Sequence, residues 1–183
     1  MINKYLSLML DPNGTVPARG LQAMHDSTTG LANRELFEDR LTQAICLANR
    51  HGWMLAVMCL DLDRFKSMDD THGHVADDCV LKEVAWRLSR HCRAEDTLCR
   101  NGRDEFLYLL LNPQCTANIE TIARRVLDDI AQPMRFDGHE IVVRPSIGIA
   151  AYPDGGATGP QLIGHADTAK YRAKEQDAGF LLC

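Results

Sequence analysis

The fold is decided by the stretch Arg100-Asn101-Gly102-Arg103-Asp104-Glu105-Phe106, a short polar tip between two apolar runs. Residues 97–99 precede this tip, and residues 107–111 follow it. An Asn-Gly pair between apolar runs is a strong signal for a tight β-hairpin, because both residues tolerate positive φ. The sequence therefore predicts two antiparallel strands, with the carboxylates of Asp104 and Glu105 just past the turn.

A second acidic group closes another apolar run, residues 53–60, which has the pattern of a buried central strand. Asp61 and Asp63 follow this run directly. If the strand lies beside the hairpin, the carboxylates of both strands converge. Convergent carboxylates are typical of a metal site, but carboxylates in a loop after a strand are also common. The pattern alone leaves both interpretations open.

The composition excludes several classes of protein. The chain has 183 residues, enough for one domain whose core needs no disulfide or structural metal. Its 7 cysteines are odd in number and never spaced as C-x-x-C, which is typical of a reduced, cytoplasmic protein. The formal charge of -5 gives no general attraction to nucleic acid polymers or anionic membranes. No apolar run is long enough to cross a bilayer, so we expect a soluble, cytoplasmic chain.

The rest of the chain alternates between helical and extended patterns. Asn33 is a candidate N-cap, because apolar residues recur at helical spacing from there to residue 49. Further helices are expected over residues 81–92, 119–130 and 162–173, and further strands over residues 141–151 and 180–182. Pro145 lacks a backbone N–H, so its strand needs a bulge or an edge position there. Strands interleaved with helices predict a layered α/β or α+β sheet domain.

Six segments, in order, resemble the GGDEF family of bacterial domains that make cyclic di-GMP or have lost the ability to make it. These segments are residues 26–34, 61–66, 73–74, 102–106, 146–149 and 166–174. We therefore expect a GGDEF domain over residues 25–183, after a linker or N-terminal extension at residues 1–24. The resemblance implies an α/β sandwich like the palm of adenylyl cyclases and polymerases. In that fold helices flank a mostly antiparallel central sheet, and the signature lies on a β-hairpin beside the first strand.

The activity that the resemblance implies is condensation of two GTP molecules to cyclic di-GMP and pyrophosphate. The matching positions make Asp61 and Asp104 the catalytic carboxylates, which would bind Mg²⁺ together with the carbonyl of Leu62. Magnesium prefers oxygen ligands, neutralises the triphosphate and lowers the pKa of the attacking 3′-hydroxyl. One domain holds one GTP, so the reaction implies two domains that face each other in a homodimer.

The resemblance also assigns residues to the nucleotide. Lys66 and Lys174 match lysines that contact the triphosphate, and Asp78 matches an acid that accepts hydrogen bonds from guanine. Gly102 matches the first glycine of the signature, and Asp69 lies at a position that reads guanine.

A separate product site is implied by Arg93-Ala94-Glu95-Asp96, which matches an inhibitory R-x-x-D motif that binds cyclic di-GMP. An arginine fork suits guanine O6 and N7, and an aspartate can anchor the polar edge of the ligand. The plain alternative is a surface ion pair between Arg93 and Asp96, worth well under about 1 kcal/mol.

Four positions depart from the family pattern, and all of them lie at the nucleotide site. Arg103 replaces the second glycine of the signature, where a side chain at positive φ would cost about 1–2 kcal/mol. Asp69 replaces an asparagine, and a carboxylate cannot donate a hydrogen bond to guanine. Asp77 replaces a glycine that precedes the guanine-binding acid. Ala178 replaces an arginine that contacts the triphosphate.

These departures predict either a site blocked by Arg103 or a turn that slips by one residue, which would aim Asp104 away from the metal. His72 and His74 resemble a metal pair, but we interpret them as turn residues. The clustered departures favour a degenerate module that binds cyclic di-GMP or GTP and regulates a partner. The alternatives are an active diguanylate cyclase and a dimerisation or docking scaffold. In each case we expect an adjacent sensor or phosphodiesterase domain in the full-length protein.

Overall fold

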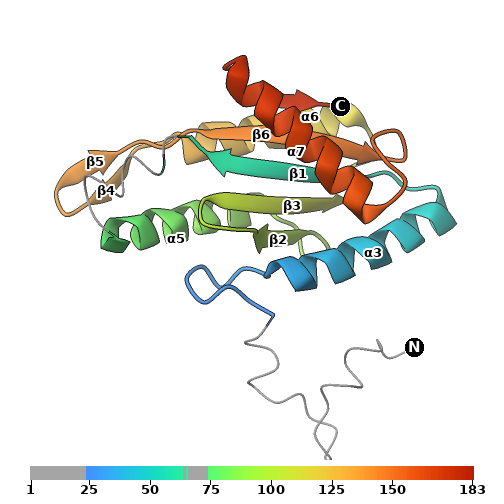
Figure 1. The fold of residues 1–183 in the computed structure, drawn as a ribbon, viewed down its shortest axis with the longest axis horizontal. Helices are drawn as coiled ribbons and strands as arrows, with labels where there is room; N and C mark the ends of the chain where they lie inside the picture. The colour runs from blue at the N-terminus through green and yellow to red at the C-terminus, as the bar shows by residue number, and fades with distance from the viewer. Residues whose placement is uncertain (1–23, 64, 66–73) are drawn as a thin grey trace, which may run out of the picture.

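The computed structural model describes residues 24–63, 65 and 74–183. Its centre is a five-stranded sheet with the order β2-β3-β1-β6-β7 (Figure 1). The strands are β1 (Leu55–Leu62), β2 (Thr97–Arg100), β3 (Glu105–Leu111), β6 (Pro145–Tyr152) and β7 (Phe180–Leu182). Three of the four strand pairs in this sheet are antiparallel, namely β2–β3, β3–β1 and β1–β6. The fourth pair, β6–β7, is parallel. The predicted mostly antiparallel sheet is confirmed.

Within the described residues, four helices cover the two faces of this sheet. They are α3 (Arg34–His51), α5 (His74–His91), α6 (Thr116–Ile130) and α7 (Gly159–Glu175). Figure 1 shows α3 and α7 in front of the sheet and α5 and α6 behind it. Alternate residues of β1 feed two separate cores, because Val57 packs on the α3 and α7 side and Met58 on the α5 and α6 side. A central strand buried on both faces explains the continuous apolar run.

The first helix is the one predicted. Asn33 is its N-cap and accepts a hydrogen bond from the Leu36 N–H at 3.0 Å. The helix ends at Gly52, whose φ of 67° is the left-handed conformation that favours glycine. β1, by contrast, begins and ends two residues later than expected, so Trp53 lies outside the strand and Asp61 lies within it.

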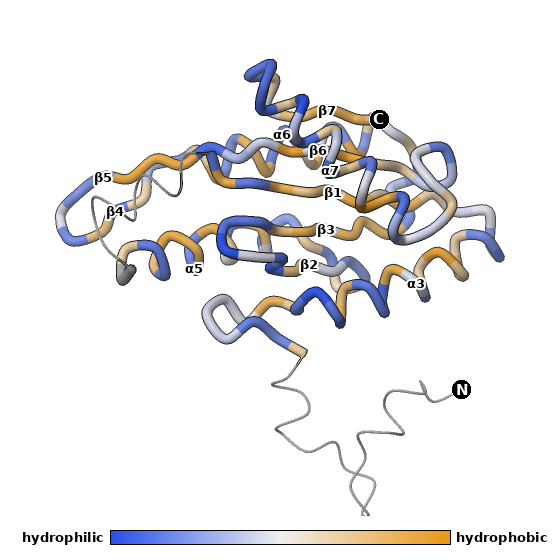
Figure 2. Tube along the Cα trace, in the orientation of Figure 1, coloured by the Kyte–Doolittle hydropathy of each residue, from blue (hydrophilic) through white to orange (hydrophobic). Residues whose placement is uncertain are grey.

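The predicted tight turn at Asn101-Gly102 is wrong. Residues 101–104 form a wider loop, which the Asn101 N–H closes by donating to the Glu105 carbonyl at 2.8 Å. Neither Gly102 nor Arg103 is among the residues with positive φ, so the strain expected at Arg103 does not arise. Side chains stabilise the wider loop, because Asn101 Nδ2 donates to Glu105 Oε2 at 3.1 Å and Arg100 Nη2 to the Arg103 carbonyl at 2.9 Å. Figure 2 shows this loop as a hydrophilic segment beside hydrophobic strands.

The strand expected over residues 141–151 is two separate strands. β5 (His139–Ile141) pairs with β4 (Met134–Phe136) in a small hairpin, and β6 begins at Pro145. Residues 137 and 138 turn this hairpin with φ of 47° and 78°, as a type I′ turn requires. Pro145 is the first residue of its strand, a position where its missing N–H is tolerated.

α7 packs unusually close to the sheet at Gly148. A Cβ added there would lie 1.9 Å from the Ala166 carbonyl oxygen and 2.0 Å from the Lys170 nitrogen. Only a residue without a side chain allows this approach. The contact brings the C-terminal half of α7 over the end of β1.

In the described part of the chain, no helix is long and apolar enough to cross a membrane.

Candidate nucleotide and metal site

The two acidic segments converge, as predicted, because β1 and β3 are hydrogen-bonded neighbours. Asp61 lies directly opposite Glu105 in the ladder, and the Leu62 N–H donates to the Asp104 carbonyl at 3.2 Å. Burial raises the pKa of Asp104, and the nearby charge of Asp61 raises it further. The predicted slip of the turn is therefore wrong, and Asp104 remains beside Asp61.

The oxygen atoms at this edge fit a magnesium ion. Asp61 and Asp104 supply carboxylates, and in an extended residue the carbonyl points to the same side as the N–H, so the Leu62 carbonyl faces the Asp104 side. Among the described residues, no group of three or more acidic, His or Cys side chains could hold a metal ion. Magnesium sites usually contain one or two carboxylates and complete their shell with water and phosphates. When bound here, the ion would neutralise a triphosphate.

Two lysines of α7, one turn apart, reach the acids of the sheet edge. Lys174 Nζ pairs with Asp61 and lies 3.0 Å from Asp63 Oδ1. Burial alone would lower the pKa of Lys174, but the hydrogen bonds to both carboxylates outweigh it and raise the pKa. The lysine predicted to contact a triphosphate thus already contacts Asp61, a carboxylate of the predicted metal site.

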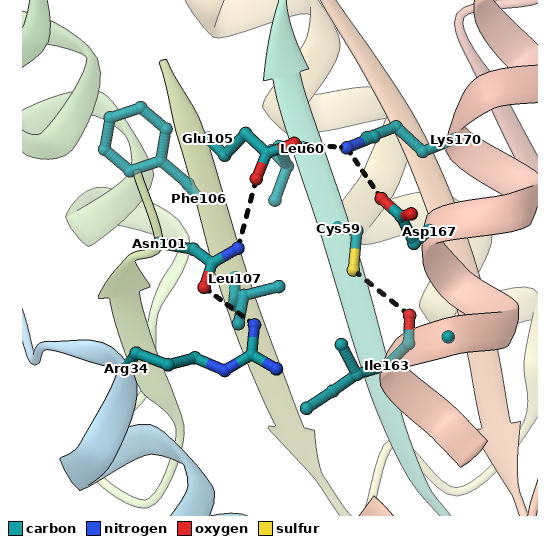
Figure 3. A pocket seen from close by; sticks show the side chains of 11 residues that line it. Arg34, Cys59, Leu60, Asn101, Glu105, Phe106, Leu107, Ile163, Asp167 and Lys170 are labelled. Atoms are coloured by element: carbon teal, nitrogen blue, oxygen red, sulfur yellow. Dashed lines mark hydrogen bonds and ion pairs between the residues drawn. The ribbon is translucent and has the colours of Figure 1, made fainter. Parts of the chain in front are cut away.

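The second lysine, Lys170, was not identified from the sequence. Its Nζ lies 2.7 Å from Glu105 Oε1 and 2.8 Å from Asp167 Oδ1 (Figure 3). These groups line a pocket of about 310 Å³ between the sheet, α3 and α7, where Arg34 Nη1 also donates to Asn101 Oδ1 at 2.7 Å. A lysine four residues before Lys174, on the same helix face, was the available signal.

The loop of the signature also contacts α5. Arg103 Nη2 lies 3.3 Å from Asp77 Oδ2, which joins two of the positions expected from the sequence to depart from the family pattern. Asp77 is buried, whereas the next residue, Asp78, is exposed. Gly102 is exposed, and a Cβ added there would come no closer than 3.8 Å to any atom beyond its chain neighbours. The fold itself therefore does not require glycine at residue 102.

Some predicted residues lie outside the described part of the chain. These are Lys66 and Asp69 of the nucleotide site, and His72. Ala178 lines a second pocket of about 310 Å³ together with Asp63 and Arg144.

The R-x-x-D turn is held to the sheet by its aspartate. Asp96 Oδ1 accepts from the Leu111 N–H at 2.9 Å, and Oδ2 accepts from the Arg93 N–H at 3.1 Å and the Tyr108 hydroxyl at 3.3 Å. Burial raises the pKa of Asp96 despite these bonds. The side chain of Arg93 is exposed, and no ion pair joins it to Asp96 in the described chain. The plain alternative of a surface ion pair is therefore wrong.

The sheet order, the flanking helices and the converging carboxylates define the palm-type α/β class that cyclases share. The chain matches the family model described as "Diguanylate cyclase, GGDEF domain" over residues 23–179, and it belongs to the GGDEF family. The resemblance seen in the sequence is confirmed, and with it the assignment to a family of cyclic di-GMP signalling.

Bacterial relatives and solved structures agree with this assignment. The chain is 44% identical over 154 residues to the bifunctional diguanylate cyclase/cyclic di-GMP phosphodiesterase MucR of Pseudomonas aeruginosa. The matched segment is 84% of this chain and 22% of MucR. It is 42% identical over 159 residues to the diguanylate cyclase TpbB of the same species, and this match is 86% of this chain and 37% of TpbB. The chain thus spans well under half the length of either relative.

The fold has close structural neighbours. A sensory box/GGDEF family protein from Caulobacter crescentus superposes with a TM-score of 0.80 at 41% identity, covering 84% of this chain and 99% of that one. The GGDEF domain of DgcB from the same species, in complex with c-di-GMP, superposes with a TM-score of 0.79 at 26% identity. This match covers 84% of this chain and 91% of the DgcB domain.

Proposed function

We propose that this domain is a regulatory GGDEF module that binds cyclic di-GMP through Arg93 and has an impaired GTP site. Its output would pass to a sensor or phosphodiesterase domain of the same protein. The relatives MucR and TpbB are much longer than this chain, which supports such a multidomain setting.

The observation that carries the proposal is the anchoring of Asp96. A buried carboxylate that accepts from two backbone N–H groups fixes the turn, while the arginine three residues earlier extends into solvent. A guanidinium on a fixed backbone loses little entropy when it binds the O6 and N7 acceptors of guanine. Asp96 acts as a positioning residue, because its oxygen atoms already accept bonds from the protein. Arg93 is then the residue that touches the ligand.

The GTP site has lost favourable contacts. Ala178 removes a cation from the triphosphate end, and losing one charge-assisted hydrogen bond costs about 1.5–3 kcal/mol, or roughly tenfold or more in affinity. Asp77 adds a buried acid next to Asp78, where an anionic ligand would lie. Asp69 removes a donor to the guanine base.

An active diguanylate cyclase is the second candidate, and a specific observation favours it. Asp104 stays beside Asp61 in spite of the altered signature, and Leu62 keeps its place between β3 and β6. Arg103 does not have a positive φ, so backbone strain at this residue is no argument against turnover. Such an enzyme would need a second domain facing this one.

The two candidates separate in one set of titrations. We expect calorimetry to detect cyclic di-GMP binding, at least tenfold weaker in Arg93→Ala and unchanged in Arg124→Ala, which removes an exposed arginine of α6. Full affinity in Arg93→Ala would contradict the proposed site. Turnover of GTP to cyclic di-GMP with Mg²⁺, lost in Asp104→Asn, would favour the cyclase. No binding of either nucleotide would leave a docking scaffold.

A further inference from the structure

Two charged residues at the proposed nucleotide site, Arg103 and Asp77, contact each other. Arg103 lies in the signature loop and Asp77 in the first turn of α5, two positions where the resemblance leads us to expect glycine, and their side chains form an ion pair at 3.3 Å. The sequence gives no reason to link residues 77 and 103, since they belong to different elements. The structure brings them together because α5 packs behind the edge of the sheet that carries the loop.

We propose that Arg103 and Asp77 act as one unit that sets the affinity of the GTP site, by bridging the signature loop to α5. This inference rests on the proposed location of that site. Asp104 and Gly102 flank Arg103 in the loop, and Asp78 follows Asp77 on the helix. A nucleotide that reached from the guanine acid to the metal carboxylates would have to pass this bridge.

The two members of the pair differ in exposure, which decides what each substitution does. The side chain of Asp77 is 8% exposed, whereas that of Arg103 is 48% exposed. A buried carboxylate depends strongly on a nearby cation, so Asp77 is better tolerated while Arg103 is present. Arg103 itself sits on a backbone held by Arg100, whose Nη2 donates to the Arg103 carbonyl. The arginine is thus presented to Asp77 from a fixed loop.

The effect of Arg103→Gly on GTP affinity should therefore depend on whether Asp77 is present, and the effect of Asp77→Gly on whether Arg103 is present. Arg103→Gly alone creates space but leaves the Asp77 charge without this cation, next to the place of an anionic ligand. It should therefore fail to improve GTP binding. Asp77→Gly alone removes the repelling charge and releases a cation near the phosphates. The double substitution restores glycine at both positions and removes both the bridge and the charge.

The test is a double-substitution cycle on the full chain, with GTP and Mg²⁺ titrated calorimetrically. We expect Asp77→Gly/Arg103→Gly to bind GTP at least tenfold tighter than the unsubstituted chain, and Arg103→Gly to bind no tighter. Arg103→Lys keeps the charge and should stay within about threefold of the unsubstituted affinity, since the ion pair can persist. Arg124→Ala, at an exposed ion pair of α6, is the matched control for the titrations and should leave the GTP affinity unchanged.

Several outcomes would overturn the inference. If Arg103→Gly alone gained as much as the double variant, Arg103 would be a simple steric block and Asp77 irrelevant. If the double variant gained nothing, the pair would not control the site. Thermal unfolding of all four chains guards against a folding artefact, because the pair predicts a non-additive change in melting temperature even where no ligand binds.

The same proteins separate this inference from the proposed function. Cyclic di-GMP binding through Arg93 does not involve the bridge, so it should be equal in all four chains. Cyclic di-GMP binding without a gain in GTP affinity would retain the regulatory module and reject the bridge. A gain in GTP affinity without cyclic di-GMP binding would support the bridge and reject the regulatory module.

Discussion

The backbone nitrogen of Lys170 lies where a side chain at Gly148 would begin, only 2.0 Å from an added Cβ. Both residues belong to the contact between α7 and β6. The same contact holds α7 close enough to the sheet for its two lysines to pair with Glu105 and Asp61. We expect Gly148→Ala to destabilise the domain by about 3 kcal/mol or more, because backbone atoms cannot move aside as a flexible side chain can.

The measurement for Gly148 is urea unfolding followed by circular dichroism. Gly164→Ala on the same helix is the control, because nothing lies within 4 Å of an added Cβ there. Alanine is a better helix former than glycine by about 0.8–1.0 kcal/mol, so this control should be neutral or stabilising. Equal midpoints for the two variants would show that α7 can shift away from the sheet.

Lys170 should stabilise the signature loop through Glu105. Lys170→Met is expected to destabilise the domain by about 1–3 kcal/mol, since it leaves a partly buried carboxylate without its cation. Adding Glu105→Gln should recover part of this loss, because the amide carries no charge. Chemical denaturation of the two single variants and the double variant measures the coupling. Strictly additive effects would mean that the pair contributes nothing beyond its separate members.

Asp104 should make stability depend on pH. Its pKa is raised in the folded chain, so the folded state binds more protons than the unfolded state between the ordinary value of 3.8 and the raised value. Stability therefore falls as the pH rises through that range, and the penalty remains in full at neutral pH. Asp104→Asn should raise the melting temperature at pH 7, and the gain should disappear below pH 3.8.

Differential scanning calorimetry across the acid range tests the role of Asp104. Asp128→Asn, at an exposed position of α6, is the matched control and should give no such gain. Magnesium should raise the melting temperature of the unsubstituted chain and not that of Asp104→Asn, because a bound cation relieves the same repulsion. A gain that persisted unchanged at pH 3 would contradict the assignment to Asp104.

Gly102 should matter for a ligand and not for the fold. Its φ is not positive and an added Cβ meets nothing closer than 3.8 Å, so Gly102→Ala should change the free energy of unfolding by no more than about 0.5 kcal/mol. If GTP approaches this backbone, as the proposed site implies, its affinity should fall several-fold. Measuring unfolding and GTP titration on one preparation tests both parts. Equal GTP affinity would place the nucleotide elsewhere.

The sequence determined the family and most of the elements. Asn33 predicted a helix start because its cap bond involves only residues three positions apart, and residues 53–60 predicted a central strand because apolar side chains on both faces need burial on both faces. The ordered motifs predicted the hairpin beside β1, and hence the meeting of Asp61 with the signature. These features depend on local periodicity or on spacing along the chain.

Only the tertiary structure decided the turn and the charge pairs. The loop at residues 101–104 is wide because Arg100, Asn101 and Glu105 bond across it, and local φ preferences of Asn-Gly are too weak to override those bonds. Asp77 meets Arg103, and Lys170 meets Glu105, from helices on opposite faces of the sheet. Such contacts follow from the packing of distant elements: the four-residue spacing of Lys170 and Lys174 puts both lysines on one helix face but does not identify their partners.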